Sequence, residues 1–142
     1  MDIDLPDVVA EVTAAFERYE RALVDNDVAT LNAMFRDDLR TIRYGGGENL
    51  YGYDEIKAFR GARLPDGLAR TLWKTVITTY GRDFAVASTL FQRASVPGKI
   101  GRQMQTWVRC EEDWLCVAAH VSFIEASMID ADAIDDPVEI AS

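Results

Sequence analysis

The sequence predicts an α+β domain in which about three N-terminal helices precede a meander of four long antiparallel strands. Two observations lead to this fold class. Most of the chain before residue 64 shows apolar residues at the three- and four-residue spacing of amphipathic helices. After residue 70 the chain instead holds four segments rich in β-branched and aromatic residues, separated by short turns.

The first helix is expected over residues 6–23, where apolar residues recur along one face. Pro6 suits the first turn, because its missing amide hydrogen removes no helical bond there. Asp27 is a good N-cap for a second helix that runs to about Phe35. Tyr19 lies within the apolar stripe of the first helix, so we expect a buried ring whose hydroxyl needs a partner.

A short strand is expected over residues 39–44, followed by three glycines at 45–47. These glycines lack the spacing of a dinucleotide-binding motif or a P-loop. A third, short helix is expected over residues 53–63, closed by the turn at 64–67.

Arg43 stands in the middle of the short strand, close to the three glycines. A guanidinium in that position is costly to bury unless it meets an anion. One interpretation is a salt bridge within the chain, for example to Glu48. The other is a planar fork that grips a substrate carboxylate through two parallel hydrogen bonds.

The turns between the β segments are short, which indicates antiparallel hairpins. Long antiparallel strands twist and coil, so the sheet is expected to wrap around the helices as a cone. The open end of such a cone would form a pocket. The four expected strands cover residues 71–80, 84–94, 101–110 and 114–125.

Alternation along the last strand places His120 and Ser122 on one face. A two-residue loop before this strand would put them opposite Gln105 and Gln103, whereas a three-residue loop would put His120 beside Met104. We favour the two-residue loop, because the grouped polar side chains could then hydrogen-bond one another. The other face would be apolar, and a homodimer through the sheet could bury it; its residues are Val117, Ala119, Val121 and Phe123.

Composition narrows the classes of function. The 142 residues suffice for one domain over 1–142, with a core at about 6–125 and an acidic tail at 126–142. A net charge of −9 argues against nucleic acid and anionic membranes as partners. No apolar run reaches the roughly 20 residues of a membrane span, and the first four residues do not resemble a secretory signal. A cytoplasmic protein is therefore expected, and its single histidine argues against a histidine-rich metal site.

Several strings between residues 8 and 124 resemble the AtzH-like (HpxZ-like) group of the nuclear-transport-factor-2-like, or SnoaL-like, superfamily. Met104 and the turn at 110–113 depart from the pattern of this group. The strings that carry the resemblance are Thr41-Ile42-Arg43-Tyr44-Gly45, Glu48, Tyr51-Gly52, Phe59-Arg60 with Arg63, Gly81-Arg82-Asp83-Phe84-Ala85, Gly101-Arg102-Gln103, Gln105-Thr106-Trp107-Val108-Arg109 and Ala118-Ala119-His120-Val121-Ser122.

The resemblance implies a cone fold and a decarboxylating amidohydrolase that needs neither metal nor other cofactor. Its implied substrate is a small anionic ureido dicarboxylate, with conversion of dicarboxyurea to allophanate in cyanuric acid degradation. The key tyrosine and arginine of the group fall on Tyr19 and Arg43. The expected substrate-binding residues are Gln105, Trp107, His120 and Ser122 around the urea core, with Arg63 and Arg70 as candidates for the second carboxylate.

Two other classes of function remain open. The first is a noncatalytic module that binds a ligand or dimerises, since a fold does not establish an activity. The second is a steroid-isomerase-like enzyme or cyclase, which needs an acid/base carboxylate facing an apolar pocket. Asp38 is the carboxylate that could serve there.

Overall fold

The computed structural model describes residues 1–64 and 67–128 of the chain. Its helices are α1 (Pro6–Val24), α2 (Val28–Ala33) and α3 (Tyr53–Ala62), with a 3-10 turn η1 (Ala126–Met128). Its strands are β1 (Ile42–Tyr44), β2 (Asn49–Tyr51), β3 (Arg70–Tyr80), β4 (Phe84–Arg93), β5 (Lys99–Cys110) and β6 (Asp113–Glu125). Most of the predicted acidic tail, from residue 129 onward, lies outside the described residues.

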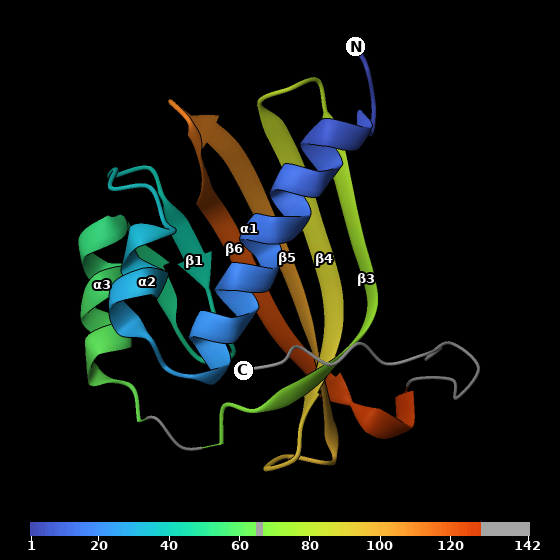
Figure 1. Ribbon diagram of the computed structural model, residues 1–142. Helices are drawn as coiled ribbons and strands as arrows, with labels where there is room; N and C mark the ends of the chain where they lie inside the picture. The colour runs from blue at the N-terminus through green and yellow to red at the C-terminus, as the bar shows by residue number, and fades with distance from the viewer. Residues whose placement is uncertain (65–66, 129–142) are drawn as a thin grey trace.

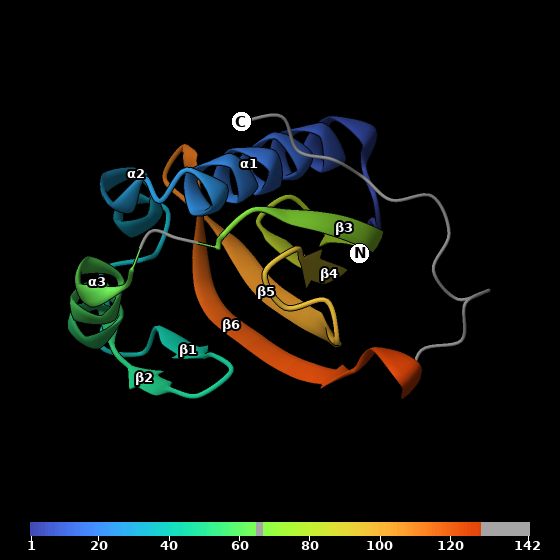
Figure 2. The same ribbon diagram turned by 90° about the horizontal axis from the view of Figure 1, so that it is seen from below.

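The strands form one sheet in the order β2-β1-β6-β5-β4-β3, and only the β1–β6 pair is parallel. The long helix α1 crosses one face of this sheet (Figure 1). Figure 2 shows that α2, α3 and the β1–β2 hairpin lie to one side, while the sheet curls from β6 round to β3. The predicted α+β fold with a curved sheet around three helices is thus confirmed.

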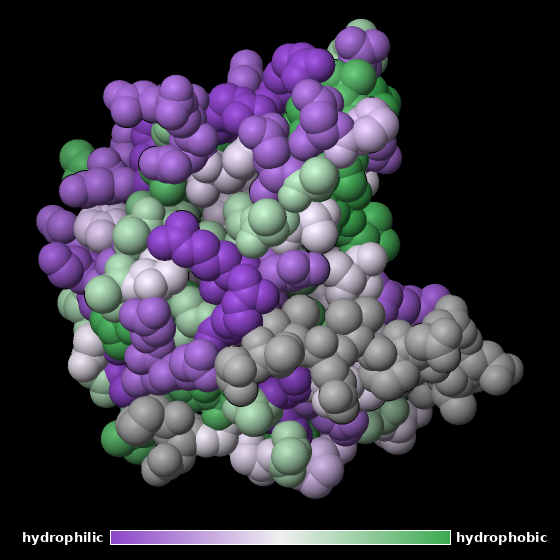
Figure 3. Space-filling model, in the orientation of Figure 1, coloured by the Kyte–Doolittle hydropathy of each residue, from purple (hydrophilic) through white to green (hydrophobic). Residues whose placement is uncertain are grey.

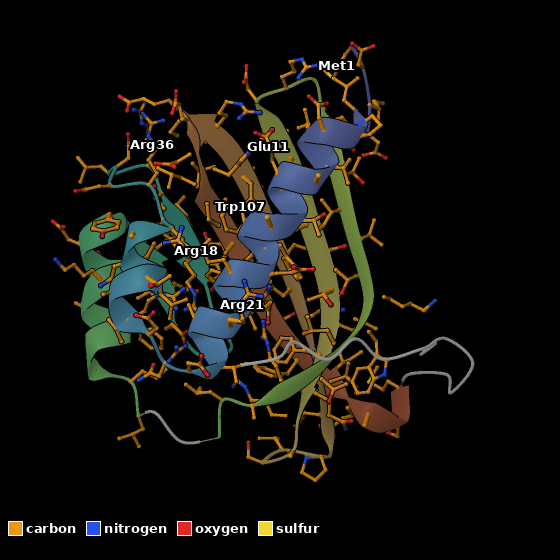
Figure 4. All side chains as sticks on the ribbon, in the orientation of Figure 1. Met1, Glu11, Arg18, Arg21, Arg36 and Trp107 are labelled. Atoms are coloured by element: carbon orange, nitrogen blue, oxygen red, sulfur yellow. The ribbon has the colours of Figure 1, made fainter. Side chains whose placement is uncertain are left out.

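The core lies between α1 and the concave face of the sheet. Val8, Val12 and Phe16 of α1 are buried there, and Trp107 of β5 is fully buried beneath the helix. Figure 4 labels Trp107 where α1 crosses the sheet, with Arg18 and Arg21 on the helix. Hydrophilic residues cover most of the opposite, outward side of α1 (Figure 3). This division is what a helix with one apolar stripe produces.

The start of β1 differs from the prediction, because the strand begins at Ile42 rather than at residue 39. Asp38 accepts hydrogen bonds from the backbone N–H and the guanidinium of Arg40. Side chains of this kind hold the backbone in a turn and so compete with strand pairing.

The β5–β6 hairpin explains why the predicted faces of β6 are wrong. The loop has two residues, Glu111 and Glu112, one position earlier than expected. Val117 is then an extra residue, because Trp107 pairs with Cys116 whereas Thr106 pairs with Ala118. A single-residue bulge reverses which face the following side chains occupy.

As a result, His120 pairs with Met104 on the outer face of the sheet. Ala119, Val121 and Phe123 instead turn towards the inside, opposite to the prediction that they form an outer dimer surface. A homodimer through the sheet stays a prediction, but Ala119 and Val121 would not line an interface on its outer face. Among the described residues, no helix is both long and apolar enough to cross a membrane.

Gly101 of β5 is required by close packing, since a Cβ there would lie 2.1 Å from the ring of Phe91. That ring is 1% exposed and cannot move freely. We expect Gly101→Ala to lower the free energy of unfolding by about 1–3 kcal/mol through overpacking. Urea denaturation measures this change. Gly98→Ala is the control, because nothing lies within 4 Å of its added Cβ; equal stability of the two variants would contradict the packing.

Candidate functional site

A cavity of about 400 Å³ opens between the β1–β2 turn, α3, the end of β4 and the last part of β6. Larger hollows exist elsewhere on the described surface, but this one brings several half-buried or buried arginines together. Its lining residues are Arg43, Gly46, Gly47, Glu48, Phe59, Arg63, Arg93, Val121 and Phe123.

Arg43 is the central residue of β1, and it faces inward opposite Ala119 of β6. Its side chain is 8% exposed, and its Nη1 donates a 2.9 Å hydrogen bond to Oε1 of Glu48. The ring of Phe59 lies against the guanidinium, 5.4 Å from its centre. Arg43 therefore forms the salt bridge to Glu48 and also lines the cavity. That it grips a substrate carboxylate stays a prediction.

Tyr19 is 3% exposed, as the apolar stripe of the first helix predicted. Its hydroxyl oxygen accepts a 2.9 Å hydrogen bond from Nη2 of Arg60. The partner that the sequence left open is thus Arg60, and among the described residues the phenol makes no hydrogen bond to Arg43. Since a guanidinium cannot accept a hydrogen bond, the phenol proton must point elsewhere. Among the described residues it has no acceptor.

Arg60 of α3 was not recognised from the sequence as a site residue. It is 1% exposed, and its guanidinium lies 5.0 Å from the ring centre of Phe35 and 5.6 Å from that of Tyr19. Its Nε and Nη1 are buried and have no partner among the described residues. One signal was available, because Ile56 and Arg60 stand four residues apart on a short helix and must therefore share its buried face.

Arg63 and Arg93 face the same cavity and are partly buried. The Nε of each is buried without a partner among the described residues. Burial, followed by repulsion from Arg60, lowers the pKa of Arg63 to about 10. Burial, followed by repulsion from Arg70, also lowers the pKa of Arg93. Both guanidinium groups remain charged at neutral pH, so the cavity carries excess positive charge.

Arg70 does not serve as a free cation. Its guanidinium binds Glu20 through two hydrogen bonds, of 2.5 Å and 2.9 Å, and also donates to Gln103. Both members of the ion pair are buried. Because Glu20 already neutralises Arg70, the expectation that Arg70 binds a second carboxylate is not supported. The pair lies deeper, where Arg70 packs 4.2 Å from the ring centre of Phe91.

Gln105 and Trp107 are buried beside Tyr19 rather than among the cavity-lining residues. The indole N–H of Trp107 donates to Oε1 of Gln105 at 3.2 Å, and the amide nitrogen of Gln105 has no partner among the described residues. The edge of Trp107 meets the Tyr19 ring, with the two ring centres 6.1 Å apart. Trp107 therefore packs directly against the ring of Tyr19, and Gln105 holds the indole of Trp107.

His120 and Ser122 lie on the outer face, so the expectation that they line the pocket is wrong. The His120 ring packs against Tyr44 at a centre-to-centre distance of 5.9 Å, and its side chain is exposed. The Ser122 hydroxyl accepts a 3.2 Å hydrogen bond from Nε of Arg102. The bulge at Val117 is the physical reason for this reversal.

The described residues contain no group of three or more His, Cys, Asp or Glu side chains placed to hold a metal ion. Cys116 is fully buried, and burial raises the pKa of its thiol to about 12. The thiolate, which is the reactive form, is therefore scarce at neutral pH. The chemistry that the arrangement offers is the binding of a small anion by arginines near a phenol that can donate a proton.

Comparison with known proteins agrees with this architecture. An AtzH-like family model matches residues 1–127. A crystal structure of a protein of unknown function from the DUF3225 family of Pectobacterium atrosepticum is 61% identical, with a TM-score of 0.85, covering 87% of this chain and 95% of that one. A cystatin-like fold protein from Burkholderia xenovorans is 47% identical, with a TM-score of 0.84, covering 87% and 97%.

More distant structures share the fold alone. A nuclear-transport-factor-2-like protein of unknown function from Pseudomonas putida is 21% identical, with a TM-score of 0.67 over 80% of this chain and 84% of that one. Among curated proteins none matches this chain. The AtzH-like family model matches nearly the whole described chain, and this protein therefore belongs to the AtzH-like family.

Proposed function

We propose that this chain is an amidohydrolase of the decarboxylating type, which converts a small ureido dicarboxylate such as dicarboxyurea to allophanate. The observation that carries the proposal is the Tyr19 hydroxyl, whose oxygen is held by Arg60 while its proton has no acceptor among the described residues. A phenol in that state can donate its proton to a bound substrate.

The charges around the cavity support a dianionic substrate. Arg43, Arg63 and Arg93 line it, whereas Glu48 is the one carboxylate among its described lining residues. A buried cation is stable only when an anion or a hydrogen-bond acceptor compensates it. A substrate with a carboxylate at each end would supply two anions, and the cavity volume of about 400 Å³ falls within the range of small-molecule sites.

In the proposed reaction, Arg43 holds the substrate by one carboxylate and so fixes its orientation. The bond between a terminal carboxylate carbon and its nitrogen breaks, and the bonding electron pair stays on the nitrogen. Tyr19 gives its proton to that nitrogen, and the carbon leaves as carbon dioxide. The phenol then regains a proton from water, while the nearby Arg60 guanidinium compensates the transient negative charge on the oxygen.

Tyr19 is not among the lining residues of the cavity, although it lies close enough to Arg63 for the two to interact electrostatically. A substrate must therefore reach inward past Arg63. This observation favours one alternative, a noncatalytic module that binds the same anions without forming a product.

The steroid-isomerase-like alternative has less support. Asp38 is bound to Arg40 at 2.8 Å, and this guanidinium holds the pKa of Asp38 well below its usual range. Glu48 is paired with Arg43. Neither carboxylate faces an apolar pocket as that chemistry requires.

Replacing Tyr19 by Phe tests the proton donor. We expect Tyr19→Phe to reduce the release of carbon dioxide from dicarboxyurea by about 10²- to 10⁴-fold, the usual contribution of general acid catalysis. The affinity for glutarate, an unreactive dicarboxylate of the same length, should change little. Tyr44→Phe is the control, because Tyr44 lies on the outer face and bonds to Tyr51.

Full activity of Tyr19→Phe would contradict the role of the phenol. If the natural chain binds glutarate but releases no carbon dioxide, the noncatalytic module is correct instead.

Glutarate binding should be independent of pH between pH 7 and 9. The protonated guanidinium binds the anion, and with the pKa of Arg63 lowered only to about 10 this form persists up to about pH 9. Affinity should fall only above that range. Calorimetric titration at several pH values measures it, with Arg43→Met as the variant that weakens binding throughout. A steady loss of affinity from pH 7 to 9 would indicate an imidazole-based site instead.

A further inference from the structure

The turn between β1 and β2 folds a carboxylate of the chain itself onto Arg43. Oε1 of Glu48 accepts the 2.9 Å hydrogen bond from Nη1 of Arg43, and Oε2 accepts a 3.2 Å bond from the backbone N–H of Gly47. The turn is closed by a 2.9 Å bond from the backbone N–H of Gly45 to the backbone oxygen of Glu48. The Glu48 carboxylate thus has two donors, one of them charged.

Gly45 makes room for this carboxylate. A Cβ at position 45 would lie 1.7 Å from Oε1 of Glu48, so any other residue would displace the carboxylate. The side chain of Glu48 is flexible, so it would turn away from such a Cβ while the backbone stays in place. The contact of the Glu48 carboxylate with Arg43 therefore depends on a glycine at position 45.

We propose that Glu48 is an internal competitor, a carboxylate of the chain itself that occupies Nη1 of Arg43 and so lowers the affinity of the cavity for ligand carboxylates. The inference rests on the anion site of the proposed function. A ligand carboxylate that takes Nη1 of Arg43 must displace Glu48. Exchanging one carboxylate for another at the same guanidinium gains little free energy.

The tether explains why a single carboxylate competes poorly. Glu48 belongs to the same short hairpin as Arg43, so its effective concentration at the guanidinium is high, in the range expected for short linkers. A monocarboxylate from solution has no such advantage. A dicarboxylate also reaches a high effective concentration at Arg43 if its other carboxylate is already bound nearby.

Arg63 and Arg93 can provide that anchor. Both line the cavity with Arg43, and the Nε of each is buried without a partner among the described residues. Neither makes an ion pair to a described carboxylate; the contact of Arg63 is a long one, 3.5 Å to Oδ1 of Asn26. A carboxylate bound here would hold the second one next to Arg43, where it can replace Glu48.

The test compares glutarate with butyrate, which lacks the second carboxylate, by calorimetric titration of the whole chain. For Glu48→Gln we expect butyrate to bind about tenfold more tightly, the effect of losing one charged hydrogen-bonding competitor. Glutarate should gain at least as much, because the same displacement of Glu48 opposes its binding. Glu55→Gln is the charge-matched control on α3, where Glu55 caps the backbone N–H of Tyr51, and it should alter neither affinity.

A second variant separates the contact from the net charge. Gly45→Ala keeps the negative charge of Glu48 but removes its carboxylate from Arg43, so it should raise the affinity for both ligands, as Glu48→Gln does. Gly61→Ala is its control, since nothing lies within 4 Å of the added Cβ on α3. Circular dichroism melting curves confirm that each variant is folded.

The proposal is overturned if Glu48→Gln weakens the binding of both ligands, because Glu48 would then be a support for Arg43 and not a competitor. It is also overturned if the affinities for both ligands are unchanged in both variants, or if no variant binds either ligand. None of these outcomes depends on turnover, so a chain that releases no carbon dioxide but shows the expected shift would refute the proposed reaction and keep the role of Glu48.

Discussion

The need of buried guanidinium groups for an anion is the constraint on which the site depends. Arg43, Arg63 and Arg93 line the cavity, and Arg60 is buried beside Tyr19; several N–H groups of Arg60, Arg63 and Arg93 are buried without a partner among the described residues. Within the described chain, Glu48 compensates only Arg43. Because these cations are kept out of water, a negatively charged ligand would stabilise them more than a neutral one would.

The same fold shows what a satisfied arginine looks like. Arg70 is as buried as Arg43, but it has Glu20 and Gln103 as partners and needs no ligand. The Arg70–Glu20 ion pair is buried in the core and carries no excess charge. The contrast between Arg70 and the cavity arginines is the strongest reason to place an anion in the cavity and not deeper in the sheet.

Much of the fold could be predicted from the sequence, because hydrophobic periodicity records which faces are buried. The helical stripe that contains Tyr19 and the order of the long strands follow directly from that pattern. The bulge at Val117 could not be predicted in this way, since an extra residue leaves the alternation around it looking regular. That one residue moved His120 to the outer face.

The site itself was only partly predictable. Arg43 could be identified because it stands in the middle of a strand, where a charged side chain needs an anionic partner. An arginine on the surface of a helix needs no such partner and does not stand out. Arg60 was missed, since arginine is common on helices and its burial depends on how α3 packs against Tyr19 and Phe35. The partner of a buried hydroxyl is a tertiary contact, and spacing along the sequence does not specify it.

A crystal structure of the protein with glutarate bound tests the central claim most directly. The account predicts one carboxylate at Arg43 with Glu48 turned away, and the other between Arg63 and Arg93. Glutarate at saturating concentration that left this cavity empty, or that bound on the outer face beside His120, would contradict it.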